Sequence, residues 1–198
     1  MWGLERLAGP AWMIRVLDHV TRALRINKRP VYLATMTIDE NLDGTFEGFH
    51  LAQVNIGIAA HPLEAPEMAD FMQNLDRVNK LGSEAPGYVW HLVGEDGFGG
   101  ATDVVWPGDP AMIVNLTVWE SVRALRAFVF AGDHVSFLRR RREFFVPQAE
   151  AIAVLWWIPA GTIPAVAEAK ARLDRLREHG PTAHAFTFQR TYAPVAEG

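Results

Sequence analysis

The sequence predicts an α+β domain, a ferredoxin-like βαββαβ sandwich with an added C-terminal helix. Strand-like and helix-like segments follow one another in the order β-α-β-β-α-β between residues 49 and 159, which is the element order of this fold. A further helical pattern follows the fourth strand. The chain has 198 residues, 49% of them hydrophobic, so one domain can bury a substantial core without disulfides or metal.

The predicted strands cover residues 50–58, 87–93, 111–119 and 151–159. The first and third strands alternate between apolar even-numbered residues and more polar odd-numbered ones, which is the period of a strand. The second strand is rich in aromatic and β-branched residues, and the fourth is apolar throughout.

The first two predicted helices have apolar residues at spacings of three and four. The first covers residues 66–81 and stops at Gly82. The second begins after Ser121, a favourable N-cap, and is broken at Gly132. Asp133 can cap a further helical run that follows this break.

The C-terminal helix is predicted from about Pro164 to His179, with Thr162 as its cap and Gly180 as its stop. We therefore place the folded domain at residues 49–190 and a short tail at residues 191–198.

Residues 1–48 form an N-terminal extension outside the predicted domain. The first 35 of them contain six Lys or Arg and two acidic residues. An amphipathic helix from Trp12 to Ile26 is one interpretation. A mis-assigned start is the other and is favoured, because Met36 opens a polar stretch directly before the first predicted strand.

Composition excludes several classes of protein. There is no cysteine, which rules out disulfides, thiolate metal sites and cysteine nucleophiles, and fits the cytoplasm as a reducing compartment. The net charge of −4 argues against nucleic acid as a partner. The basic N-terminal stretch has no apolar run long enough to span a membrane.

The two faces of the first and third strands differ in polarity. We expect the apolar even-numbered face to lie under the two helices of the βαββαβ unit. The odd-numbered face has no Lys or Glu, unlike a solvent-exposed face, so we expect it to be covered and partly polar. The economical arrangement is a homodimer, a dimeric α/β barrel in which two such sheets enclose a ligand cavity. Its lining would include Gln53, Asn55, Asn115, Thr117 and Trp119, with either Trp90 or His91 from the second strand.

Five segments also resemble a known family: FHLAQVNIGI, MADFMQNLDRVNKLGSEAPGYVWHL, IVNLTVWESVRALRAFVF, HVSFLRRRREFF and AVLWWIPAG. They are similar to domain-of-unknown-function family 3291, and the likeness runs from about His50 to Arg190. The resemblance implies the dimeric α/β-barrel superfamily, whose relatives include antibiotic-biosynthesis monooxygenases, haem-degrading monooxygenases and chlorite dismutases. It implies no particular reaction.

A narrower similarity concerns the haem-degrading monooxygenases, which use an Asn on the first strand and a Trp and a His on the second helix. Asn55 matches that Asn. The Trp and His positions fall on Phe128 and Leu138, and the nearest histidine is His134. These departures argue against haem degradation and leave haem held by His134 as an alternative.

The leading hypothesis is a small-molecule enzyme or binder, with no cofactor and no metal. An enzyme of this kind would resemble a cofactor-independent monooxygenase that acts on an aromatic or apolar substrate. The alternatives are a non-catalytic ligand-binding or dimerisation module and a haem-binding protein.

Each candidate residue has a role in this hypothesis. Asn55 and Asn115 would hydrogen-bond an oxyanion, Trp119 and Trp90 would stack the substrate, and His134 or His91 would transfer a proton. A surface position for His134 and a core position for His91 are the competing interpretations. The candidate catalytic residues are Asn55, His91, Trp119 and His134, and the candidate substrate-binding residues are Gln53, Trp90, Asn115, Thr117, Phe128 and Arg139.

Arg139 begins a run of four arginines. It could clamp an anion near the cavity mouth. A solvated helix surface is the other and favoured interpretation, because four successive helical residues point around most of the circumference.

Overall fold

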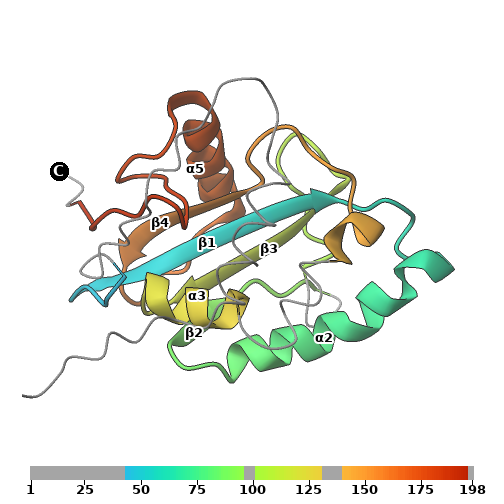
Figure 1. Ribbon diagram of the computed structural model, residues 1–198, viewed down its shortest axis with the longest axis horizontal. Coiled ribbons are helices and arrows are strands. Elements are labelled where there is room, and N and C mark those ends of the chain that lie inside the picture. Colours follow the sequence, from blue (N-terminus) through green and yellow to red (C-terminus); the bar gives the residue numbers. More distant parts are fainter. Residues whose placement is uncertain (1–42, 96–100, 131–139, 196–198) are drawn as a thin grey trace, which may run out of the picture. The chain divides into compact units, whose positions relative to one another are not determined.

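The computed structural model describes residues 43–95, 101–130 and 140–195 (Figure 1). Its elements follow the predicted βαββαβ order with an added helix, which confirms the fold class. The elements are β1 (Phe49–Ile58), η2 (Pro66–Met68), α2 (Ala69–Ser83), β2 (Tyr88–His91), β3 (Met112–Trp119), α3 (Val122–Val129), β4 (Ala153–Pro159) and α5 (Val166–His179).

The four strands form one antiparallel sheet in the order β2-β3-β1-β4. The central pair β1 and β3 is in register over the whole length of β3, from Leu51 opposite Trp119 to Ile58 opposite Met112. Every odd-numbered residue of β1 therefore shares a face with an odd-numbered residue of β3. In β4 the same face also carries the odd-numbered residues, because Leu51 lies opposite Trp157.

The even-numbered face of the sheet is a dry core covered by α5. Ala52, Val54 and Leu116 are completely buried there together with Leu173 of α5. Trp156 of β4 is also buried on this face, and its Nε1 donates a hydrogen bond of 2.9 Å to Glu168 Oε1 on α5. The buried indole N–H is thereby satisfied, which fixes the helix on the sheet.

The odd-numbered face lies under α2 and α3. Leu51 and Trp119 form a buried cluster with Leu125 of α3 at one end of this face. At the other end the Phe145 ring lies over Gly57, and Phe71 of α2 meets that ring edge to face at 5.2 Å.

The predicted assignment of the faces is therefore wrong. The alternation correctly marked the even-numbered face as dry, but dryness does not say which helix covers it. The C-terminal helix α5 takes that face (Figure 1), and one end of the odd-numbered face is apolar enough to pack against α3. The predicted pairing of two sheets requires a face without helices, whereas both faces carry helices of the same chain. The homodimer stays a prediction, for which the mass in solution is the measurement.

Helix boundaries follow local signals with two exceptions. Helix α2 continues through Gly82 and ends at Ser83, so the predicted stop at Gly82 is wrong; a glycine inside a helix is tolerated at a modest cost. Ser121 Oγ accepts a hydrogen bond of 3.1 Å from the Ala124 backbone N–H, which confirms the predicted cap of α3. Gly180 follows α5 with a φ of 71°, a conformation that glycine adopts without strain. Helix α5 begins at Val166 rather than at Pro164, with Ala165 and not Thr162 at the N-cap. Gly132 and Asp133 lie outside the described residues.

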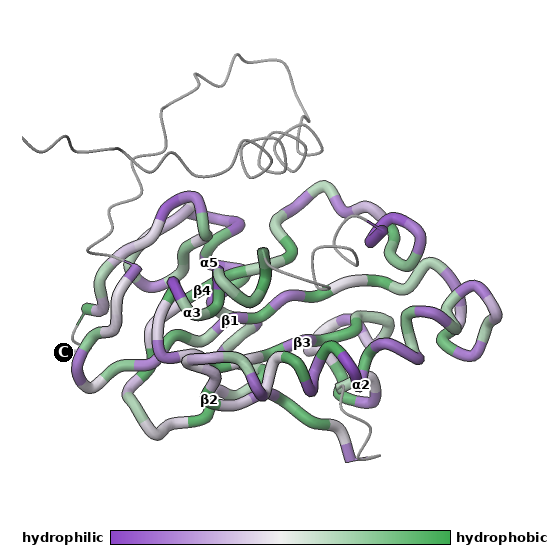
Figure 2. Tube along the Cα trace, turned by 60° about the horizontal axis from the view of Figure 1, so that its bottom comes forward, coloured by the Kyte–Doolittle hydropathy of each residue, from purple (hydrophilic) through white to green (hydrophobic). Residues whose placement is uncertain are grey.

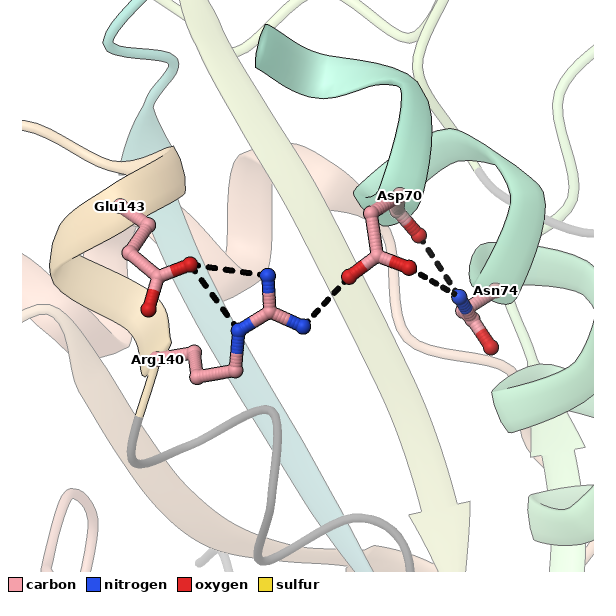
Figure 3. A network of polar contacts seen from close by, with 4 residues as sticks. All are labelled: Asp70, Asn74, Arg140 and Glu143. Atoms are coloured by element: carbon pink, nitrogen blue, oxygen red, sulfur yellow. Dashed lines mark hydrogen bonds and ion pairs between the residues drawn. The ribbon is translucent and has the colours of Figure 1, made fainter.

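A short helical segment, residues 140–144, is fastened to the start of α2 (Figure 3). Arg140 forms ion pairs with Asp70 of α2 at 2.5 Å and with Glu143 at 2.8 Å. Hydrogen bonds to Glu143 and Asp70 raise the pKa of Arg140 above its usual range. Asn74 also donates to the Asp70 carboxylate at 3.0 Å. This network holds one end of α2 in place beside the odd-numbered face.

Candidate functional site

A row of polar side chains crosses the middle of the odd-numbered face. Trp119 Nε1 donates to Thr117 Oγ1 at 2.9 Å, and Thr117 Oγ1 donates to Gln53 Oε1 at 3.0 Å. Gln53 Nε2 donates to Asn55 Oδ1 at 3.0 Å, and Asn115 Nδ2 donates to the same oxygen at 2.9 Å. We call these five residues the polar row.

The register of β1 and β3 builds the polar row. Gln53 lies opposite Thr117, and Asn55 lies opposite Asn115. Directly opposed side chains on one face of an antiparallel pair are close enough to interact. The hydrogen bonds therefore run across the two central strands as well as along them.

The row leaves specific groups at Asn55 and Asn115 unpaired. Asn55 Oδ1 accepts two hydrogen bonds, from Gln53 and Asn115, which fixes the orientation of the Asn55 amide. Within the described part of the chain, neither Asn55 Nδ2 nor Asn115 Oδ1 has a hydrogen-bond partner. The structure thus presents an oriented N–H donor and a carbonyl acceptor next to each other.

This end of the polar row is open to solvent. Asn115 is exposed and Asn55 is partly exposed, although β3 and β1 are the two inner strands of the sheet. At the other end, Trp119 retains 1% of its exposure and Gln53 retains 7%. The row therefore leads from a buried indole to two accessible amides.

The face of α2 that turns towards the sheet supplies apolar groups. Phe71 packs on Phe145 at one end of the helix, and Gly82 approaches Phe128 of α3 at the other end. Leu75 and Val78 lie on the same helix face, because the spacing 71, 75, 78, 82 follows the helical repeat. Both are only half-buried. Figure 2 shows the resulting mixture of apolar and polar residues along α2.

His91 lies on the same sheet face as the polar row. It is the register partner of Thr117, whereas Trp90 is the partner of Val118. Trp90 packs against the even-numbered core. The structure thus answers which residue of β2 faces the polar row. Burial lowers the pKa of His91, so the ring is neutral at pH 7.

Tyr88 is a further residue of this face that the sequence alone did not reveal. Its hydroxyl is hydrogen-bonded to His91 Nδ1, and its ring meets Trp119 edge to face at 5.6 Å. Burial raises the pKa of Tyr88, and a hydrogen bond with the His91 backbone opposes that rise. A spacing of three normally puts two strand residues on opposite faces, so period-two analysis could not pair them.

The structure places the other predicted site residues in different surroundings. Trp119 is enclosed, with Phe128 stacked on it at 5.2 Å and Tyr88 at its edge. Its ring therefore leaves no open face on which a ligand could stack, and its contact with the polar row is the hydrogen bond to Thr117. Phe128 belongs to the same apolar cluster. His134 and Arg139 lie outside the described residues. The structure brings together Gln53, Asn55, His91, Asn115, Thr117 and Trp119, and places Trp90 on the opposite face.

No group of three or more His, Asp or Glu that could hold a metal ion occurs in the described ranges. In the same residues, no helix is both long and apolar enough to cross a membrane. Haem held by His134 stays an alternative prediction.

Comparisons with known proteins bear on the family. No curated protein matches the chain. A solved structure from Chloroflexus aurantiacus J-10-fl, provisionally named an antibiotic biosynthesis monooxygenase, is similar with 15% identity and a TM-score of 0.35, over 59% of this chain and 98% of that chain. The family model described as Domain of unknown function (DUF3291) matches residues 50–197. This match covers most of the chain and confirms the predicted resemblance, so the chain belongs to the DUF3291 family.

Proposed function

We propose that this protein binds a small molecule, aromatic or otherwise apolar and carrying an oxygen acceptor, on the odd-numbered face of its own sheet. The observation that supports the proposal is the oriented Asn55 amide. Two hydrogen bonds hold Asn55 Oδ1, so Asn55 Nδ2 points away from the row. The amide therefore does not have to reorient when a ligand binds. Such preorganisation lowers the cost of ordering a donor for its ligand.

The ligand has a polar and an apolar side in this proposal. The oxygen acceptor meets Asn55 Nδ2, and a donor on the ligand can meet Asn115 Oδ1. The apolar body contacts the half-buried Leu75 and Val78 of α2. Binding sites for small molecules commonly combine a mostly apolar lining with a few placed polar groups.

Oxygenase-like chemistry is the enzymatic form of the same proposal. An Asn donor held by its neighbours stabilises negative charge that develops on a substrate oxygen, as in an oxyanion hole. In this form the Asn55 N–H is the electrostatic group, and His91 is the titratable group on the same face. Neither residue carries a charge at pH 7, which suits an apolar substrate.

A non-catalytic ligand-binding protein is the second candidate. It is favoured by one observation: the polar row consists entirely of uncharged side chains. A site without a carboxylate has fewer means of activating a substrate than a site with a general base.

A ligand screen by thermal shift tests the site. Small aromatic and apolar molecules with a carbonyl or phenol group are added to wild type, Asn55→Ala, Asn115→Ala and Gln73→Ala. The last is a matched control, because Gln73 is an exposed amide on α2. We expect compounds that raise the melting temperature of wild type and of Gln73→Ala, with the rise lost in both Asn variants. Equal rises in all four proteins would show that ligands bind elsewhere.

The enzymatic form is tested on the ligands found in this way. Oxygen consumption and product formation, measured with wild type and Asn55→Ala, separate turnover from binding alone. Binding without turnover would favour the non-catalytic candidate.

A further inference from the structure

A β-bulge puts Tyr88 and His91 on one face of the sheet. Tyr88 pairs with Trp119, but the next residue of β3, Val118, pairs with Trp90, so Val89 is the extra residue. Without it, residues three apart would point to opposite sides. Bulges re-aim side chains in this way and are common beside functional sites.

The Tyr88–His91 pair has a defined protonation state at neutral pH. Burial raises the pKa of Tyr88 and lowers that of His91, so the phenol keeps its proton and the imidazole is neutral. A neutral imidazole has one N–H donor and one bare nitrogen acceptor. A phenol O–H is a stronger donor than an imidazole N–H, and a bond in which the phenol donates to Nδ1 requires the imidazole proton to reside on Nε2.

Within the described ranges, neither ring of the Tyr88–His91 pair has an ion pair. Helix α2 packs on β2, and its C-terminal charges, Lys80 and Glu84, lie 3.9 Å from each other. Glu120 lies beside the turn at Gly87. Thr117 faces His91 from β3 and hydrogen-bonds Gln53 and Trp119.

We propose that Tyr88 is a positioning residue that fixes the tautomer of His91, so that His91 Nε2–H becomes a second hydrogen-bond donor to the ligand, on the same sheet face as Asn55. Asn115 is the diagonal neighbour of His91 on this face, at a Cα separation of about 7–8 Å. Asn55 lies opposite Asn115 on β1, one strand further from His91, which corresponds to a Cα separation of about 11–12 Å. A ligand with one aromatic ring between two oxygen acceptors spans that distance. This inference rests on the proposed ligand site and narrows its ligands to those with two separated oxygen acceptors, one for each donor.

Nitrogen NMR of protein labelled with ¹⁵N-histidine tests the positioning role without a ligand. In wild type we expect His91 to carry its proton on Nε2 and to have a pKa below 6.5. In Tyr88→Phe we expect a mixture of tautomers and a higher pKa, because the lost hydrogen bond stabilised the neutral ring. Tyr192→Phe is the matched control, because the Tyr192 hydroxyl donates to Pro181 O instead, and it leaves His91 unchanged.

Two results would overturn the positioning role. One is a wild-type His91 protonated on Nδ1. The other is a Tyr88→Phe variant with unchanged tautomer and pKa, or with a lower pKa, which would mean that Nδ1–H donates to the tyrosine oxygen. The same spectra report whether Tyr88→Phe is folded, through the signals of the other histidines.

Methyl 4-hydroxybenzoate, a neutral aromatic ring with an oxygen acceptor at each end, tests the donor role. We expect it to shift both the His91 Nε2 signal and the side-chain amide signal of Asn55 in wild type. A shift at Asn55 without one at His91 would refute the donor role of His91 and leave the proposed site standing. A shift at neither residue would refute the site itself.

Discussion

Asn115 Nδ2 donates a hydrogen bond of 2.9 Å to Asn55 Oδ1 across the two central strands of the sheet. This pair is where the polar row reaches solvent, because Asn115 is exposed and Asn55 is partly exposed. The hydrogen bond does more than join the strands. It saturates the Asn55 oxygen and so directs the opposite end of that amide, the Nδ2 donor, to whatever occupies this face.

Asn55→Asp keeps the acceptor on which the polar row depends and removes the donor that is assigned to the ligand. The carboxylate still accepts from Gln53 and Asn115, but the donor at Nδ2 is gone. We expect the free energy of unfolding, measured with urea, to stay near that of wild type, because hydrogen bonds to a charged acceptor are stronger. Ligand-induced stabilisation is expected to disappear for ligands with an oxygen acceptor. Full retention of that stabilisation would mean that Asn55 Nδ2 is not the donor.

Asn55→Ala is expected to destabilise the fold as well. Gln53 is 7% exposed, and its Nε2 donates to Asn55 Oδ1. Losing that acceptor leaves a buried donor unpaired, which costs about 1–3 kcal/mol. Comparing the urea unfolding curves of the two variants therefore isolates the structural role of the oxygen from the binding role of the nitrogen.

Gly57→Ala is expected to disturb the end of the odd-numbered face. A Cβ on Gly57 would lie 2.7 Å from Phe145 Cδ1. The ring cannot move freely, because backbone hydrogen bonds from Ala60 to Phe144 O and from Val146 to Ile58 O hold this segment against β1. We expect a loss of about 1–3 kcal/mol, typical of overpacking, in urea unfolding.

Gly44→Ala is the matched control for Gly57→Ala. A Cβ at Gly44 has no atom within 4 Å, so its stability should change little. Equal unfolding curves for the two variants would show that Phe145 does not restrain position 57.

The order and type of the elements could be predicted because each depends on local pattern. Alternation in β1 and β3, the cap at Ser121 and the stop at Gly180 are all visible in the sequence and are all confirmed. The covering of each face could not be predicted in this way. Apolar groups at Leu51, Trp119 and Trp157 make one end of the odd-numbered face suitable for helix packing, and only the fold shows that α3 uses them.

The polar row was predicted more fully than its surroundings. Period two places Gln53, Asn55, Asn115 and Thr117 on one face, and the structure brings them together. The same pattern could not show that Trp119 is enclosed by Phe128, since enclosure depends on α3. The bulge at Val89 changes the period within β2, so a regular pattern could reveal neither the orientation of His91 nor its pairing with Tyr88.

Leu173→Ala tests the covering of the even-numbered face. Leu173 of α5 is 0% exposed and belongs to the sheet core. Truncating a fully buried leucine costs about 2–5 kcal/mol, and we expect this loss in urea unfolding. Ile163→Ala, at a residue that is 63% exposed, should change little. A small effect of Leu173→Ala would mean that α5 does not contribute to the core in solution.

His91→Gln is expected to change how stability depends on pH. Burial lowers the pKa of His91 below its ordinary value of 6.5, so the unfolded chain binds a proton at a higher pH than the folded protein does. The contribution of neutral His91 is therefore complete above pH 6.5, and it is lost as the pH falls from there through the folded-state pKa. Wild type should lose more stability than His91→Gln between about pH 7.5 and pH 5, a range that spans the ordinary histidine pKa.

His179→Gln, at an exposed histidine outside the site, should follow the wild-type curve. Parallel curves for wild type and His91→Gln would show that the folded protein does not hold this ring neutral, and the donor assigned to Nε2 would lose its basis.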